Sequence, residues 1–194
     1  FPISLVVCKR NDKVIKEATE QELQRKGQVY YLHNRVGTIA MVKNRLEKLI
    51  PKAKIAVIHG RLGEKELMRV MDEFEKKHYD ILVATTIIEN GLDIPNVNTI
   101  IINNSQNFGL SQLHQIRGRV GRHYHQAFAY FLIPRKAPLT DSAKKRLGAI
   151  EKHCALGSGF NLSVKDLEIR GAGALFGYAQ SGGGRIGFDL YSKI

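Results

Sequence analysis

Two arginines three residues apart stand among glycines in the segment 115–122, which reads QIRGRVGR. On a helical turn Arg119 and Arg122 project to the same side, because residues three apart are neighbours there. Two guanidinium groups held side by side repel each other, and a multiply charged anion between them offsets that cost. The planar guanidinium fits phosphate oxygens, while Gly118 and Gly121 allow close approach and a sharp turn. The segment predicts a site for a multiply charged anion, such as a nucleotide triphosphate; a solvated basic helix end is the alternative.

Five short apolar runs are the candidate strands that would position these arginines. They are rich in Val, Ile, Tyr and Phe and comprise residues 29–33, 54–60, 80–86, 99–103 and 127–133. Several are apolar on both faces, which is typical of a parallel sheet covered by helices. Helical patterns alternate with them at 12–26, 36–50 and 64–77, and a loop and helix are expected over 107–119. This alternation predicts an α/β fold with right-handed crossovers.

Open α/β sheets bind ligands beyond the carboxyl ends of their strands. The arginine segment follows the run 99–103, so we expect Arg119 and Arg122 to lie near that edge of the sheet.

The composition changes after Ile133, where the proline-containing segment 134–141 reads as a linker. Thr140 or Asp141 can cap the helix that follows, and glycines crowd the rest of the chain. We therefore expect a sheet domain over 1–135 and a small appendage over 136–194, which is too short for a core of its own. The appendage must pack on the sheet domain or on a partner.

The formal net charge of +12 favours binding to a polyanion, with a solvated lysine-rich surface as the alternative. The apolar share of 43% and charged share of 25% are ordinary for a soluble globular protein. No uncharged apolar run reaches about 18 residues, so no membrane span is expected.

Cysteine and histidine spacing predicts neither a redox motif nor a metal site. Cys8 and Cys154 are isolated, which suits a reducing cytoplasm. His123 and His125 lack further ligands at suitable spacing. Residues 1–10 have no basic segment ahead of their apolar residues, so they do not resemble a signal peptide and look like the cut edge of a longer protein. A cytoplasmic location is expected.

Four motifs resemble those of the superfamily 2 helicases and translocases. The sixth motif, Q-x-x-G-R-x-G-R, is matched without a gap by Gln115, Gly118, Arg119, Gly121 and Arg122. Residues 81–97 resemble the fifth motif, residues 28–36 the fourth, and residues 56–62 the short segment after the fourth. Their order and spacing agree with the family, which implies a RecA-like parallel sheet flanked by helices.

Within this superfamily the segment 85–134 is similar to the double-stranded DNA translocases of two sister groups, the transcription-repair coupling factors and the RecG-type helicases. Residues 166–182 resemble the translocation motif that both groups share, a small C-terminal helical hairpin and loop. The segments 123–134, 170–173 and 186–191 favour the coupling factors.

In this family ATP lies between two RecA-like domains, and the first carries the phosphate-binding loop and the magnesium ligands. The chain has no G-x-x-x-x-G-K-[ST] motif, so the resemblance implies a second motor domain. It further implies that Arg119 and Arg122 reach the triphosphate, at least one as an arginine finger, and that Gln115 positions the γ-phosphate or the attacking water. Asp93 would contact the nucleotide ribose after a turn at Gly91; a turn cap is its alternative role.

The resemblance also implies DNA contacts. The hydroxyls and backbone N–H groups of Thr85 and Thr86 would hold a DNA phosphate, and the backbone at His59 and Gly60 would contact DNA. The alternatives are β-branched residues that finish a strand and an ordinary loop turn. Glu89 is expected to link the DNA and nucleotide sites.

Arg170 and Gln180 match the polar positions of the translocation motif and would couple cleft closure to movement of the hairpin. A surface arginine is the alternative for Arg170. Relatives usually carry acidic residues near Ala174, Tyr178 and Ala179, which this chain lacks.

The resemblance thus implies half of an ATP-driven translocase that needs ATP, magnesium, double-stranded DNA and the first motor domain, and that does not hydrolyse ATP alone. For a coupling factor it also implies displacement of stalled RNA polymerase and recruitment of excision-repair proteins through regions outside this chain. A RecG-type branch-migration helicase, a passive nucleic-acid-binding module and a protein-interaction domain that uses the glycine-rich tail are the alternatives.

Overall fold

The computed structural model describes residues 3–85, 97–117, 120–121, 125–136 and 138–152. The strands within these residues are β1 (Ser4–Lys9), β2 (Gln28–Leu32), β3 (Ile55–Ile58), β4 (Ile81–Ala84), β5 (Val97–Asn103) and β6 (Phe128–Ile133). The helices are α1 (Asp12–Gln24), α2 (Ile39–Leu49), α3 (Glu64–Glu75), α4 (Leu110–Arg117) and α5 (Asp141–Lys152), with short 3₁₀ turns η1 (Val36–Thr38) and η3 (Ser105–Asn107).

The described strands form one sheet in the order β1-β6-β5-β2-β4-β3, with every neighbouring pair parallel. The expectation of a parallel α/β sheet is therefore confirmed. β1 is a strand that the sequence did not predict. It lies at the edge of the sheet, and Ser4, Val6 and Lys9 are exposed, so it lacks the doubly apolar character of the strands inside.

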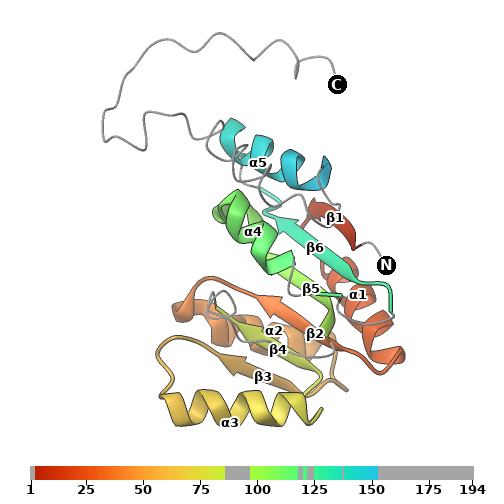
Figure 1. Ribbon diagram of the computed structural model, residues 1–194, viewed down its shortest axis with the longest axis vertical. Coiled ribbons are helices and arrows are strands. Elements are labelled where there is room, and N and C mark those ends of the chain that lie inside the picture. Colours follow the sequence, from red (N-terminus) through yellow and green to blue (C-terminus); the bar gives the residue numbers. More distant parts are fainter. Residues whose placement is uncertain (1–2, 86–96, 118–119, 122–124, 137, 153–194) are drawn as a thin grey trace.

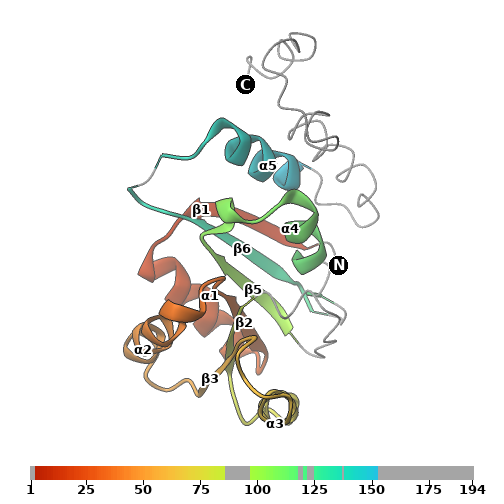
Figure 2. The ribbon, with the colours of Figure 1, turned by 90° about the vertical axis from the view of Figure 1, so that its left-hand side faces the viewer.

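Helices cover both faces of the sheet. α1 and α2 pack on one face through a cluster that includes Ile15, Leu46 and Tyr31. α3, α4 and α5 cover the opposite face, where the second cluster includes Phe74 and Ile116. The ribbon in Figure 1 and the turned view in Figure 2 show α1 and α2 on the side of the sheet away from α3 and α4. Burial on both sides explains why β2, β4 and β5 read as continuous apolar runs.

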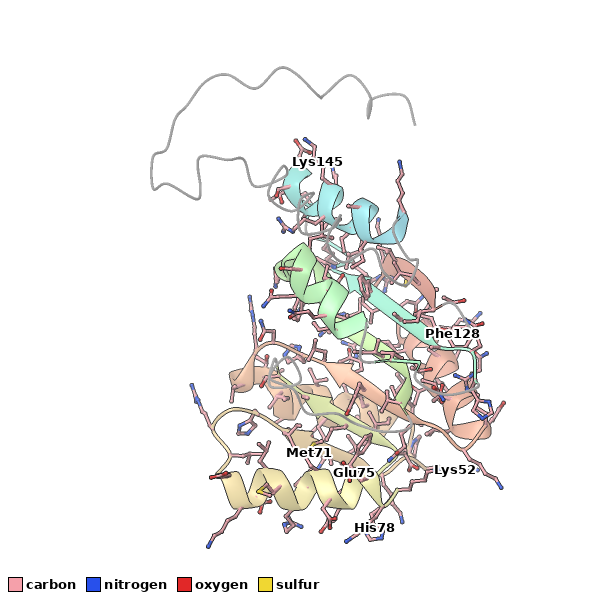
Figure 3. All side chains as sticks on the ribbon, viewed as in Figure 1. Lys52, Met71, Glu75, His78, Phe128 and Lys145 are labelled. Carbon is pink, nitrogen blue, oxygen red and sulfur yellow. The ribbon has the colours of Figure 1, made fainter. Side chains whose placement is uncertain are left out.

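Local sequence explains where several helices begin and how they are oriented. Asn11 caps α1, since its side chain accepts a hydrogen bond from the Lys13 amide. Thr140 caps α5 in the same way for Ala143. α3 presents Met71 to the sheet, as its stripe of apolar residues predicts (Figure 3).

α5 belongs to the predicted appendage and packs on the sheet domain, against α4, η3 and β1. Its buried residues include Ala143, Leu147, Ala149 and Ile150, each at most 8% exposed. The helical hairpin expected over 166–182 lies outside the described residues.

The strand order places a topological switch between β5 and β2. The chain leaves β2 through α2 toward β3, and it leaves β5 through α4 toward β6, on the other side. The two connections diverge, so a crevice is expected at the carboxyl ends of these two adjacent strands.

Candidate functional site: two edges of one sheet

The carboxyl edge of the sheet brings four polar side chains into one row. Leu32 pairs with both Ile102 and Ala84, and Ala84 also pairs with Ile58. The residues that follow the strand ends along this row are therefore His59, Thr85 and His33, with Asn103 ending β5 beside them. The row joins the fourth motif, the segment after it and the start of the fifth motif.

Thr85 has fewer hydrogen-bonding groups available to a ligand than the sequence suggested. Its backbone N–H donates to the Ile58 carbonyl at 3.3 Å, and the residue is 5% exposed. The backbone amide is therefore already used by the sheet, which corrects the expectation that it is available for a phosphate. Its side-chain hydroxyl is what remains for such a contact, and Thr86 lies outside the described residues.

His59 and Gly60 form a tight turn after β3. The Leu62 amide donates to the His59 carbonyl at 3.0 Å, and the Arg61 amide donates to His59 Nδ1 at 3.3 Å. Gly60 is exposed, and a Cβ placed on it would meet no atom within 4 Å. The turn leaves the Gly60 backbone open to solvent, which is the property that a backbone contact with a ligand requires.

A pocket of about 460 Å³ opens at the carboxyl ends of β1, β2 and β5, between α1 and α2. This is the crevice that the switch between β5 and β2 predicts. The residues that line it are Arg10, Asp12, Ile15, Tyr31, His33, Arg35, Thr38, Met41, Val42, Arg45, Leu46, Leu49, Asn103 and Asn104. It combines three arginines with one carboxylate, and Asp12 is bonded to Arg45 at 2.7 Å.

A hydrogen-bond network fixes the polar end of this pocket. Asn103 Nδ2 lies 3.1 Å from His33 Nδ1, and His33 Nε2 lies 2.7 Å from Thr38 Oγ1. If the asparagine amide donates to Nδ1, the ring carries its proton on Nε2 and donates to Thr38. Burial, followed by the charges of Arg35 and Arg10, lowers the pKa of His33, so the ring is neutral at pH 7.

Tyr31 supplies a second uncharged polar group to the pocket. Burial raises the pKa of its phenol to about 12, against the opposing effect of Arg10 and Arg45. The phenol therefore stays protonated at neutral pH and can donate a hydrogen bond.

The arginine motif ends at the opposite edge of the sheet. α4 starts beyond the carboxyl end of β5 and runs back along the sheet, with Gln115 exposed near its end. The Gly121 amide lies 3.4 Å from the carbonyl of Val97, the first residue of β5. Gly121 therefore does not lie at the carboxyl edge, where the motif was expected, because α4 runs from that edge back toward the amino end of β5.

Gly121 has the backbone geometry that the motif was expected to need. Its φ is +86°, in the region where side chains are disfavoured. A Cβ there would lie 2.7 Å from the Cβ of Ala127 and 3.5 Å from Ile3. The motif glycine thus allows both a sharp turn and a close approach to the strand ends.

Several predicted site residues lie outside the described residues. They are Glu89, Gly91, Asp93, Gly118, Arg119, Arg122, Arg170 and Gln180. Their roles stay predictions. Over the residues that are described, no group of three or more His, Cys, Asp or Glu side chains could hold a metal ion. Within that same part of the chain, no helix is long and apolar enough to cross a membrane.

Sequence reasoning missed Arg10, His33, Arg35 and Asn103. The fourth motif contains His33 and Arg35, which was a signal that a site lay nearby. Arg10 and Asn103 gave no signal, because only the pairing of distant strands brings their chain ends together.

The parallel sheet and the row of motif residues at its carboxyl edge define a RecA-like domain of the helicase C-terminal type. The model of the family described as the helicase conserved C-terminal domain matches residues 9–124, more than half of the chain. The chain belongs to this family.

Particular relatives are closer still. Over its whole length the chain is 50% identical to the transcription-repair-coupling factors of Staphylococcus aureus (strain USA300) and Staphylococcus epidermidis (strain RP62A). It spans 17% of the length of each of these relatives.

Among solved structures, RecG bound to a three-way DNA junction matches with a TM-score of 0.75 and 33% identity, over 90% of this chain and 23% of RecG. The C-terminal domain of the DEAD-box protein Dbp5 matches at TM-score 0.58 and 19% identity, over 78% of this chain and 85% of that domain, and supports the fold alone.

Proposed function

We propose that the chain is the second motor domain of an ATP-dependent double-stranded DNA translocase of the transcription-repair coupling type. The observation that carries the proposal is the 50% identity to the coupling factors over the whole chain. In the full protein this domain would help to displace stalled RNA polymerase in the cytoplasm, and repair proteins would bind through regions outside this chain.

The two edges of the sheet support a division of labour. The described strands have four to seven residues, so the edges are separated by roughly 13–23 Å. We assign DNA contacts to the carboxyl edge, through the Thr85 hydroxyl, Thr86, His59 and the open Gly60 backbone. We assign the nucleotide to the side where Gly121 lies.

ATP would be held jointly with the first motor domain, which would also supply the magnesium ligands. From this chain, Arg119 and Arg122 would stabilise negative charge on the transferring phosphoryl group, and Gln115 would orient the γ-phosphate or the attacking water. Asp93 would accept hydrogen bonds from the ribose hydroxyls.

The connection from Thr85 to Val97 links the edges covalently, since it begins at the carboxyl end of β4 and ends at the amino end of β5. It contains Glu89, Gly91 and Asp93. We propose that this connection transmits nucleotide binding to the DNA edge, and that Arg170 and Gln180 relay cleft closure to the appendage.

The test is ATP hydrolysis by the longer protein that contains this domain. We expect Arg119→Ala and Arg122→Ala each to lower the DNA-stimulated rate by on the order of 10³, because the finger stabilises charge that develops in the transition state. Nucleotide affinity should change little. Lys65→Gln, an exposed residue of α3, is the control and should hydrolyse ATP normally. Undiminished hydrolysis in both arginine variants would leave a passive nucleic-acid-binding module as the better explanation.

A RecG-type branch-migration helicase is the second candidate, favoured by the 33% identity to RecG over 90% of the chain. The two candidates differ in the substrate of the longer protein. We expect it to displace RNA polymerase halted on duplex DNA and to leave a three-way junction unresolved. Processing of the junction without displacement of polymerase would favour the RecG type.

A further inference from the structure

The pocket between α1 and α2 has an apolar floor. Ile15, Tyr31 and Leu46 lie there, each at most 4% exposed, and Val42 lines the wall beside them. Its volume of about 460 Å³ lies in the range of small-ligand sites, which are typically apolar with a few placed polar groups.

The rim of the same pocket is positively charged. Arg45 is held by Asp12. Arg10 and Arg35 form no ion pair with a carboxylate among the residues that the structure describes, and both lie close enough to lower the pKa of His33. Three arginines and a single carboxylate give the pocket an excess of positive charge, which favours an anionic ligand.

The polar end of the pocket has an acceptor with no donor. Asn103 is 2% exposed; its Nδ2 is used by His33, while its Oδ1 is buried without a hydrogen-bond partner. A buried, unsatisfied carbonyl oxygen is costly, and a ligand hydroxyl or amino group that donates to it removes that cost.

We propose that this pocket binds one nucleotide unit, with its phosphate on Arg10 and Arg35 and a sugar or base donor on Asn103 Oδ1. The remaining face of the sugar or base packs on Tyr31, Val42 and Leu46. A nucleotide joins these three properties in one ligand: phosphate oxygens, a hydrogen-bond donor and a flat, weakly polar body. The unit comes either from a free nucleotide or from a nucleic-acid strand.

This site is distinct from the proposed ATP cleft. It lies at the carboxyl ends of β1, β2 and β5, whereas Gly121 of the arginine motif lies at the amino end of β5.

The experiment measures binding of adenosine 5′-monophosphate to the 194-residue chain by calorimetry, without magnesium or ATP. We expect saturable binding at one site. Adenosine and inorganic phosphate should each bind at least about tenfold more weakly, because each supplies only part of the recognition. Arg10→Gln and Arg35→Gln should each weaken the nucleotide at least about tenfold through loss of a charged hydrogen bond.

A variant that fills the pocket distinguishes nucleotide binding in the pocket from nonspecific electrostatic attraction to the positively charged chain. Val42→Phe keeps all three arginines and fills the space between α1 and α2, so it should also weaken the nucleotide at least about tenfold. Lys65→Gln removes one positive charge from exposed α3 on the other face and should bind normally. Circular dichroism checks that each variant is folded.

Competition identifies the source of the unit. Displacement of the nucleotide by a 5′-phosphorylated oligothymidine, with weaker binding of that strand to Val42→Phe, would identify a nucleic-acid strand; failure to displace it would identify a free nucleotide. The proposal is overturned if nucleotide binding is absent, equals that of phosphate, survives both the arginine and Val42→Phe substitutions, or is displaced better by poly-glutamate. Nucleotide binding to this pocket is measured without ATP hydrolysis. The binding proposal can therefore fail while the proposed function stands, and the proposed function can fail while the binding proposal stands.

Discussion

Gly121 is the motif residue whose identity the backbone dictates. Its positive φ costs a residue with a side chain roughly 1–2 kcal/mol, and a Cβ would also press on Ala127, which is completely buried. Sequence alone predicted a sharp turn here from the glycine. It did not predict the contact, because Ala127 immediately precedes β6 and closes on Gly121 only when β6 joins the sheet.

We expect Gly121→Ala to lower the free energy of unfolding by about 2–4 kcal/mol, the sum of the backbone strain and the overpacking against Ala127. Urea unfolding of the 194-residue chain measures it.

Gly148→Ala is the matched control for this substitution. Gly148 lies in α5, and a Cβ there would meet nothing within 4 Å. Alanine should therefore stabilise the helix by up to about 1 kcal/mol. Equal effects of Gly121→Ala and Gly148→Ala on the free energy of unfolding would contradict this account. A neutral Gly121→Ala would mean that the turn is not constrained.

At the level of elements, α5 is the connection between the sheet domain and the rest of the appendage. Arg146 Nη2 donates to the Gln106 carbonyl in η3 at 3.1 Å, and Nη1 donates to Ser142 Oγ at 2.7 Å. With Leu147 and Ile150 buried below it, this arginine ties the helix to the loop that follows β5. Arg146 therefore anchors α5 at the carboxyl edge of the sheet.

We expect Arg146→Ala to loosen α5 selectively. The amides of α5 should exchange hydrogen about tenfold faster, which corresponds to the loss of about 1.4 kcal/mol from the charged hydrogen bond. Amides of β2 and β5 should be unaffected. Lys144→Ala removes an exposed ion pair with Asp141 on the same helix and should change little. Uniform acceleration across the sheet would instead indicate that Arg146 stabilises the whole domain.

Periodicity was enough to locate the elements between residues 12 and 133. The helices α2 and α3 and the strands β2 to β6 were each expected within a few residues, because burial on both faces or on one stripe leaves a clear pattern. α1 was also expected, although its apolar stripe is poor. β1 was missed for the opposite reason: at the edge, its exposed Ser4, Val6 and Lys9 break the pattern. An edge strand such as β1 is identified by the strand with which it pairs, and its partner β6 is distant in the sequence.

For the whole molecule, strand order decides what the site contains, and strand order is not a local property. The helicase motifs indicated which residues belong to a site, yet the fifth motif reaches the carboxyl edge of the sheet and ends at the amino edge, where Gly121 of the sixth motif also lies. Likewise, Arg10, His33 and Asn103 line one pocket only because the sheet brings the carboxyl ends of β1 and β5 to the same edge as that of β2, across the switch. Parallel pairing between strands distant in sequence leaves no periodic signal, so this part of the site required the structure.

The pairing of β1 with β6 also constrains synthesis. Ser4 lies opposite Phe128, so β1 leaves the ribosome about 120 residues before β6, the strand with which it pairs, is made. At a synthesis rate of 5–20 residues per second, β1 remains an unpaired apolar segment for about 6–25 s, and its backbone N–H and C=O groups have no strand partner during that time. A chain that is cut short just before β6 would leave both β1 and β5 without the strand that joins them, and such truncated products should be prone to aggregation.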